Sequence, residues 1–116
     1  MKFPESKRFS EDDEQKVALV DVDETICFYS AARKYNLSEP NYDNITKINK
    51  LYDEGWKILY WTARGSKSKV DYTEHTRGQL DSWGCKFHEL VTGTSNNPKP
   101  NFDLLIDDKA KRIEEL

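Results

Sequence analysis

The sequence lacks the features that mark several classes of protein. It has two cysteines, Cys27 and Cys85, which lie far apart and form no Cys-x-x-Cys motif, so neither a disulfide framework nor a zinc site is predicted. No apolar run approaches the roughly 18 residues of a membrane span, and residues 1–15 lack the apolar core of a signal peptide. The net charge is −3, with no basic block. We therefore expect a cytoplasmic protein with a small-molecule partner, and neither a nucleic-acid nor a membrane partner.

The composition that remains is that of a single folded domain. Hydrophobic residues make up 36% of the 116 residues and charged residues 34%, which is polar but sufficient for one modest core. Residues 1–15 mix charges of both signs and are predicted to form a charged leader. Residues 16–116 are predicted to form the domain.

Strands and helices alternate along that domain. Strands are predicted at residues 17–22, 57–62, 86–91 and 102–106. Helices are predicted between them, from Asp43 or Asn44 to Gly55 and from Ser68 to Gly84, with a terminal helix indicated by Ala110, Ile113 and Leu116. The first strand, V-A-L-V-D-V, is apolar without alternation, as in a strand buried on both faces of a parallel sheet. The order predicts an α/β fold with a small, mainly parallel sheet.

Reactive side chains follow three of the predicted strands, at the edge of the sheet where ligands bind in open α/β folds. They are Asp21, Asp23, Thr62, Asp107 and Asp108, with Lys99 in the preceding loop. Extended backbone would direct Asp21 and Asp23 to the same side. If the last strand lies beside the first, four carboxylates converge and repel one another. A hard cation such as Mg²⁺, with Lys99, would relieve that repulsion.

Four segments together resemble a known family. D-V-D-E-T at 21–25, W-T-A-R-G at 61–65, Lys99 and I-D-D-K-A at 106–110 are similar, in this order, to the four motifs of the haloacid-dehalogenase (HAD) superfamily of phosphohydrolases. One motif alone would carry little weight, whereas four in order are specific. The resemblance implies a three-layer Rossmann-like fold and a Mg²⁺-dependent phosphatase.

The resemblance also implies a role for each residue. Asp21 would be the nucleophile that forms an aspartyl-phosphate, and Asp23 the general acid and then the general base. The phosphate-binding residues would be Thr62, Ala63 and Lys99. The metal ligands would be Asp21, Asp23 and Asp107, supported by Asp108. Arg64 either binds a charge of the substrate or lies in a surface turn.

The length of the chain limits what covers the site. Between Asp23 and Thr62, and between Thr62 and Lys99, core elements nearly fill the sequence, which leaves no room for a cap domain. Capless relatives act on large substrates or are covered by neighbouring subunits in a homo-oligomer. The phrase K-P-x-F-D-L-L-I-D-D-K-A resembles small phosphatases of capsule and lipopolysaccharide sugar biosynthesis, which implies a sugar phosphate or a related intermediate as substrate. Glu24 departs from the glycine of many members, so a tight turn there must carry a side chain.

Other interpretations stay open. The aspartates could be turn or capping residues, and His75 and His88 are predicted to be structural or exposed. A receiver-type phosphoacceptor also uses an Asp cluster, Thr, Lys and Mg²⁺, but its adjacent acidic pair follows the first strand, whereas Asp107 and Asp108 come last here. A third alternative is a HAD-like domain that binds phosphorylated ligands without turnover, against which Asp23 argues.

Overall fold

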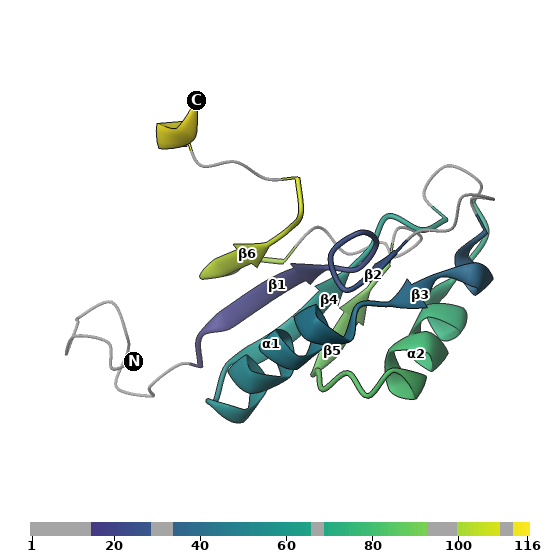
Figure 1. Ribbon diagram of the computed structural model, residues 1–116, viewed down its shortest axis with the longest axis horizontal. Helices are drawn as coiled ribbons and strands as arrows, with labels where there is room; N and C mark the ends of the chain where they lie inside the picture. The colour runs from purple at the N-terminus through teal and green to yellow at the C-terminus, as the bar shows by residue number, and fades with distance from the viewer. Residues whose placement is uncertain (1–14, 29–33, 66–68, 93–99, 110–112) are drawn as a thin grey trace.

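Four parallel strands form the centre of the fold (Figure 1). The computed structural model describes residues 15–28, 34–65, 69–92, 100–109 and 113–116. In chain order its elements are β1 (Val17–Asp21), β2 (Cys27–Phe28), the 3₁₀ turn η1 (Tyr35–Leu37), β3 (Glu39–Pro40), α1 (Tyr42–Asp53), β4 (Lys57–Trp61), α2 (Thr73–Ser82), β5 (Glu89–Val91), β6 (Leu104–Ile106) and the 3₁₀ turn η2 (Ile113–Glu115). The sheet order is β5-β4-β1-β6, and β2 and β3 form a separate antiparallel pair. The prediction of an α/β, Rossmann-like fold with a small parallel sheet is confirmed.

The sheet brings the first and last strands together. β1 pairs with β4 on one side and with β6 on the other, and Val20 is opposite both Tyr60 and Ile106. The chain therefore leaves β1 toward one edge of the sheet and returns on the other side of β1. Ligand sites of open α/β sheets lie at such a reversal, beyond the carboxyl ends of the strands. Asp21 and Asp107 are neighbours at this point.

The core lies between the sheet and the two α-helices. Its buried side chains include Ala18 and Val20 of β1, Ile58 and Tyr60 of β4, Ile45 and Ile48 of α1, and Leu80 of α2. Because alternate residues of a strand share a face, both helices pack on the face that carries the even-numbered residues. On the opposite face Leu19 and Leu59 are also buried. β1 is thus apolar on both faces, which explains its unbroken hydrophobic run.

The helices end where glycine was predicted to end them, and α1 begins earlier. Gly55 and Gly84 follow the helices with φ of +102° and +77°, the left-handed conformation that glycine adopts without steric cost. The cap of α1 is Asn41, whose side-chain oxygen accepts from the backbone N–H of Asn44 at 3.1 Å. The predicted cap, Asp43 or Asn44, was therefore wrong. The predicted cap of α2, Ser68, lies outside the described residues.

Two strands are shorter than predicted, because a side chain accepts a hydrogen bond where the backbone ladder would begin. Before β6, the carboxylate of Asp103 accepts from the backbone N–H of Val17 at 2.8 Å, in place of a backbone carbonyl. Before β5, Nδ1 of His88 accepts from the backbone N–H of Ile58 at 2.9 Å. Both segments therefore contact the sheet before the regular ladder begins. The predicted C-terminal helix is represented by η2, whose Ile113 is 75% exposed, while Ala110 lies outside the described residues.

Little structure separates β1 from α1. The described residues of that stretch form β2, η1 and β3, each two or three residues long, and these strands were too short to show a period in the sequence. The charged leader falls almost wholly outside the described residues. Within the described part of the chain, no helix is long and apolar enough to cross a membrane.

Candidate active site

Three carboxylates meet beyond the carboxyl ends of β1 and β6. One oxygen from each of Asp21, Asp107 and Asp108 lies within 4.8 Å of the others. Asp21 ends β1, and the other two follow β6 directly. The cluster therefore results from the pairing of the first and last strands. Carboxylate oxygens are the donors that Mg²⁺ prefers, so the donor set fits a hard divalent cation.

Asp21 lies in surroundings that disfavour its charge. Burial is the main cause, and the neighbouring charges of Asp107, Asp23 and Asp108 add to it, which together raise the pKa of Asp21 to about 6. The lysine that the structure places beside the cluster is Lys109, whose Nζ lies 3.1 Å from Asp108 on the exposed side. The predicted phosphate-binding lysine, Lys99, lies outside the described residues. A cation bound between the carboxylates would remove the repulsion at Asp21.

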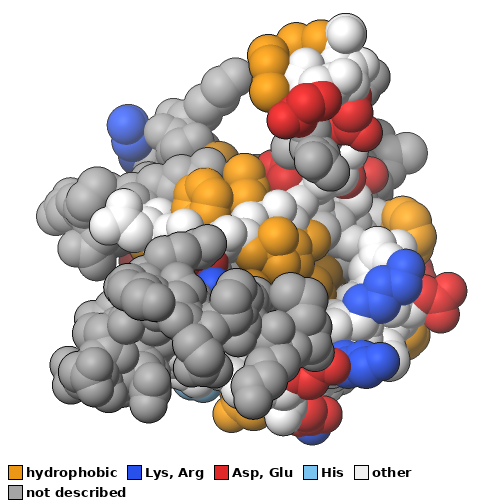
Figure 2. Space-filling view, turned by 90° about the vertical axis from the view of Figure 1, so that its left-hand side faces the viewer, with side chains coloured by type: hydrophobic (Ala, Val, Ile, Leu, Met, Phe, Trp, Pro, Cys, Tyr) orange, Lys and Arg blue, Asp and Glu red, His pale blue; other side chains and the backbone are white. Residues whose placement is uncertain are grey.

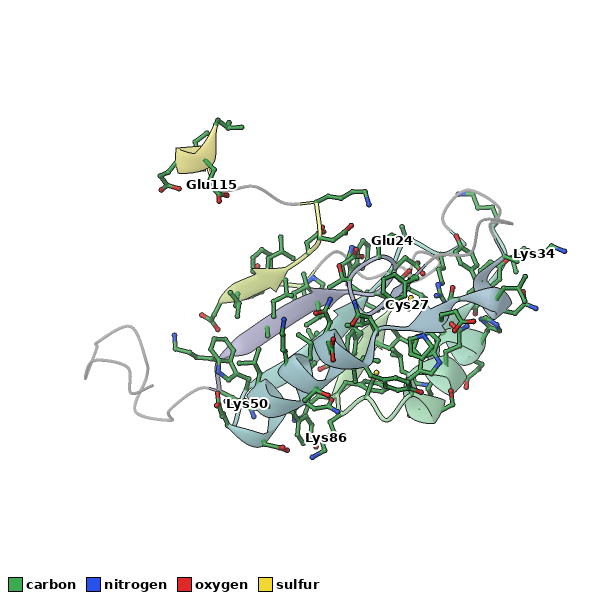
Figure 3. The ribbon with its side chains drawn as sticks, viewed as in Figure 1. Glu24, Cys27, Lys34, Lys50, Lys86 and Glu115 are labelled. Carbon is green, nitrogen blue, oxygen red and sulfur yellow. The ribbon has the colours of Figure 1, made fainter. Side chains whose placement is uncertain are left out.

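The turn after β1 connects the two acidic loops. The hydroxyl of Thr25 accepts from the backbone N–H of Asp108 at 3.1 Å. The backbone carbonyl of Thr25 accepts from Asn44 Nδ2 at 2.8 Å. Thr25 thus fixes the β6 loop to the start of α1. Glu24, beside it, has a φ of +69°, so the tight turn expected at this position does carry a side chain in the left-handed region. Figure 3 shows Glu24 and Cys27 in this turn beyond β1.

Asp23 is not part of the acidic cluster that Asp21 belongs to. Its Oδ1 lies 2.7 Å from Nη2 of Arg64, and Nε of Arg64 donates to both of its oxygens at 3.1 and 3.2 Å. The hydroxyl of Thr62 donates to Oδ2 at 3.2 Å, and the thiol of Cys27 lies 3.7 Å from Oδ1. Three of the four predicted carboxylates therefore converge. The side chain of the fourth, Asp23, which was predicted to be a metal ligand, faces a buried guanidinium instead of joining the cluster.

Arg64 is buried, with 1% of its surface exposed. Its Nη1 donates to Thr76 at 3.2 Å and to Gln79, both on α2, and its guanidinium carbon lies 4.6 Å from the centre of the Tyr35 ring. It is therefore neither a surface-turn arginine nor an open group for substrate charge. The burial of Arg64 could have been inferred from Thr76, a polar residue at a core position of the α2 pattern.

The remaining candidates have structural partners. Thr62 is buried, and its hydroxyl also accepts from the backbone N–H of Arg64 at 3.2 Å. Ala63 follows it and is exposed. Burial raises the pKa of the Cys27 thiol to about 12, which makes it a poor nucleophile. His88 stacks on Tyr52 with ring centres 4.8 Å apart, and His75 is exposed on α2, in agreement with the roles predicted for them.

A cavity of about 410 Å³ adjoins the acidic cluster between α1 and β6. Asp107 and Asp108 form part of its wall, Ile48, Leu51 and Ile106 line its apolar part, and Lys47 adds a cation. Its volume is within the range of small-molecule sites.

Hydrophobic side chains are also exposed on the opposite side of the molecule, at the amino ends of the strands (Figure 2).

Comparisons with known proteins bear on the fold alone. Neither protein-family models nor curated proteins match the chain. The crystal structure of a structural-genomics target from Vibrio cholerae is similar, with a TM-score of 0.63 and 24% sequence identity over 87% of this chain and 86% of that one. At this identity the likeness shows a shared fold, which fits the parallel sheet described above.

Proposed function

We propose that the protein is a Mg²⁺-dependent phosphomonoester hydrolase of the HAD type, with Asp21 as its nucleophile. The observation that carries the proposal is the cluster of Asp21, Asp107 and Asp108 at the carboxyl ends of two neighbouring parallel strands. A turn motif or a helix cap would explain any one of these aspartates, but not three whose oxygens meet. The four ordered motifs of the sequence support the same reading.

The residues divide the hydrolysis into two displacements. The Asp21 carboxylate attacks phosphorus, the bond from phosphorus to the leaving oxygen breaks, and Asp23 protonates that oxygen. Asp23 then accepts a proton from water, whose oxygen attacks the aspartyl-phosphate, releasing phosphate and restoring Asp21. Mg²⁺, held by Asp21 and Asp107 with Asp108 in support, would supply positive charge to the phosphoryl oxygens. Thr62, Ala63 and Lys99 are the proposed phosphate-binding residues.

The substrate class follows from the sequence resemblance and from the space beside the site. The proposed substrate is a sugar phosphate or a related intermediate of polysaccharide biosynthesis, handled in the cytoplasm. Asp107 and Asp108 line part of the cavity between α1 and β6, and we propose that this cavity receives the part of the substrate that leaves. Assembly into a homo-oligomer is a second proposed feature, because the described residues between β1 and α1 form no cap.

Phosphate release with and without Mg²⁺ tests the proposal. We expect the wild-type protein to hydrolyse p-nitrophenyl phosphate and some of a panel of sugar phosphates with Mg²⁺, and to be inactive in EDTA. Asp81→Asn, which neutralises an exposed aspartate of α2, is the matched control and should keep full activity. If a phosphoenzyme accumulates from a small phosphodonor without turnover, the protein is a phosphoacceptor. If neither product forms, the proposed activity is wrong.

A further inference from the structure

The contact between Asp23 and Arg64 includes more hydrogen bonds than a simple ion pair. The side chain of Arg64 is fully buried, whereas that of Asp23 is 24% exposed. The guanidinium directs Nε and Nη2 at the carboxylate, and its other end is held by Thr76 and Gln79 of α2. Gln79 is itself fixed, since its Nε2 donates to the Tyr35 carbonyl at 2.7 Å. The donors that meet Asp23 therefore have little freedom to move.

Stability alone gives a weak reason for such an arrangement. Burying a guanidinium costs desolvation energy that its ion pair offsets only in part, and apolar side chains of similar size often stabilise a core as well. The planar guanidinium, in contrast, donates two hydrogen bonds in one plane, an arrangement called a fork here. This fork fixes both the position and the plane of a carboxylate. Thr62 adds a further donor on Oδ2. The result is one carboxylate held in place at the rim of the candidate site.

The neighbouring cluster shows what the fork prevents. Asp23 lies two residues from Asp21, and a cation among Asp21, Asp107 and Asp108 would attract any free carboxylate nearby. A carboxylate bound to that cation could not approach the leaving oxygen or the attacking water. With both oxygens engaged by Arg64, the side chain of Asp23 stays out of the cluster.

We propose that Arg64 is a positioning residue, which holds the carboxylate of Asp23 at the reacting oxygens and away from the metal ligands. The inference rests on the proposed function, because it gives a purpose to Arg64 only if Asp23 transfers protons. Arg64 touches neither substrate nor metal in this role. It acts through Asp23 alone, and this dependence can be tested.

A double-mutant cycle is the decisive experiment. In the wild-type background, Arg64→Lys keeps the charge but loses the fork, and kcat should fall by about 10²-fold, the scale of lost acid–base help, with KM little changed. In the Asp23→Asn background the same substitution should cause almost no further loss of kcat. Equal losses in the two backgrounds would overturn the inference, since a general structural role does not depend on Asp23.

The leaving group gives a second readout. p-Nitrophenolate departs without a proton, so Arg64→Lys should keep the initial burst of p-nitrophenol and slow only the steady rate, in which water must be activated. With an alkyl phosphate both phases should slow. Equal slowing of burst and steady rate for both substrates would contradict a role through Asp23.

Thermal melting with Mg²⁺ separates this inference from failure of the fold or of the function. Arg64→Lys should melt cooperatively and retain a Mg²⁺-dependent rise in Tm, because Asp21, Asp107 and Asp108 are unchanged. If Arg64→Lys does not fold, Arg64→Gln, which retains planar N–H donors, takes its place in the cycle. A wild-type protein without burst or turnover contradicts the proposed function, whereas an active wild type with additive losses contradicts only the role of Arg64.

Discussion

Two aspartates at the end of β1, two residues apart, lie in opposite electrostatic surroundings. Asp21 is partly buried beside the like charges of Asp107 and Asp108, whereas Asp23 is held by a buried arginine. The first set is mostly negative: Lys109 lies at its edge, and Lys47 lines the adjoining cavity. The second is balanced within the chain. Like charges surround Asp21, whereas an opposite charge pairs with Asp23, so substitutions of the two should have opposite effects on stability.

Asp21→Asn should have the largest effect on activity and should also stabilise the metal-free protein. An amide cannot form an acyl phosphate, so turnover of p-nitrophenyl phosphate should fall to background. Removing one charge from the cluster relieves repulsion, so Tm without Mg²⁺ at pH 7 should rise above that of the wild type. Calorimetry and phosphate release on the same samples check both. Retained turnover would remove Asp21 as nucleophile.

The gain in stability should depend on pH with a definite sign. The pKa of Asp21 is raised to about 6 in the folded protein, so between about pH 4 and pH 6 the folded state binds more protons than the unfolded state. The contribution of Asp21 to wild-type stability should therefore fall as pH rises through this window, while Asp21→Asn lacks this contribution. The difference in Tm between the two should grow from pH 4 to pH 7. A constant difference would mean that repulsion at Asp21 is unimportant.

Asp23→Ala should destabilise the protein, in contrast to Asp21→Asn. It leaves the guanidinium of Arg64 buried without a carboxylate, and breaking a buried pair in this way costs about 3 kcal/mol. Urea unfolding measures the change. The control is Asp53→Ala, which breaks the exposed Asp53–Lys86 pair at 2.9 Å and should cost less than ~1 kcal/mol. Similar losses in both variants would show that burial of Arg64 does not distinguish the two pairs.

Mg²⁺ should stabilise the folded protein by binding to the cluster of Asp21, Asp107 and Asp108. At 100 times its dissociation constant, a cation that binds only the folded state adds about 2.7 kcal/mol, which is readily seen as a rise in Tm. Asp107→Asn removes a proposed ligand and should weaken the rise, whereas Asp81→Asn on α2 should leave it intact. Equal shifts in these two variants would mean that Mg²⁺ responds to general acidity, and the cluster would lose its role.

The sequence was informative where local pattern and burial coincide. The apolar run of β1 predicted a strand buried on both faces, and F-D-L-L-I at 102–106 predicted a strand that ends just before Asp107–Asp108; both predictions agree with the structure. Arg64 was missed because its partners lie 12 to 41 residues away in the chain, on α2 and in the β1 turn, and no local period reports such contacts. Arginine is also rarely buried, so a surface position was the natural expectation.

Spacing likewise could not separate the two aspartates. Two residues of extended backbone would direct Asp21 and Asp23 to one side, but Asp23 follows the end of β1, where the turn begins. Its orientation depends on which charge lies nearest in three dimensions, and that charge is Arg64. β2 and β3 were missed for a simpler reason, because two residues each cannot show alternation.

The smallest expected effect concerns Glu24, which directly follows Asp23 in the turn after β1. With a φ of +69° it occupies the left-handed region, where a side chain costs roughly 1 kcal/mol and glycine costs nothing sterically. Glu24→Gly should therefore stabilise the protein, by at most ~1 kcal/mol, because glycine also gains freedom in the unfolded chain. Glu24→Gln tests the charge alone, and Glu54→Gly, at a φ of −83° after α1, should destabilise by about 0.5–1 kcal/mol. Urea unfolding of the three variants measures these changes. If Glu24→Gly proves less stable than Glu24→Gln, the turn is not strained, and the side chain of Glu24 contributes to the folded state through its own contacts.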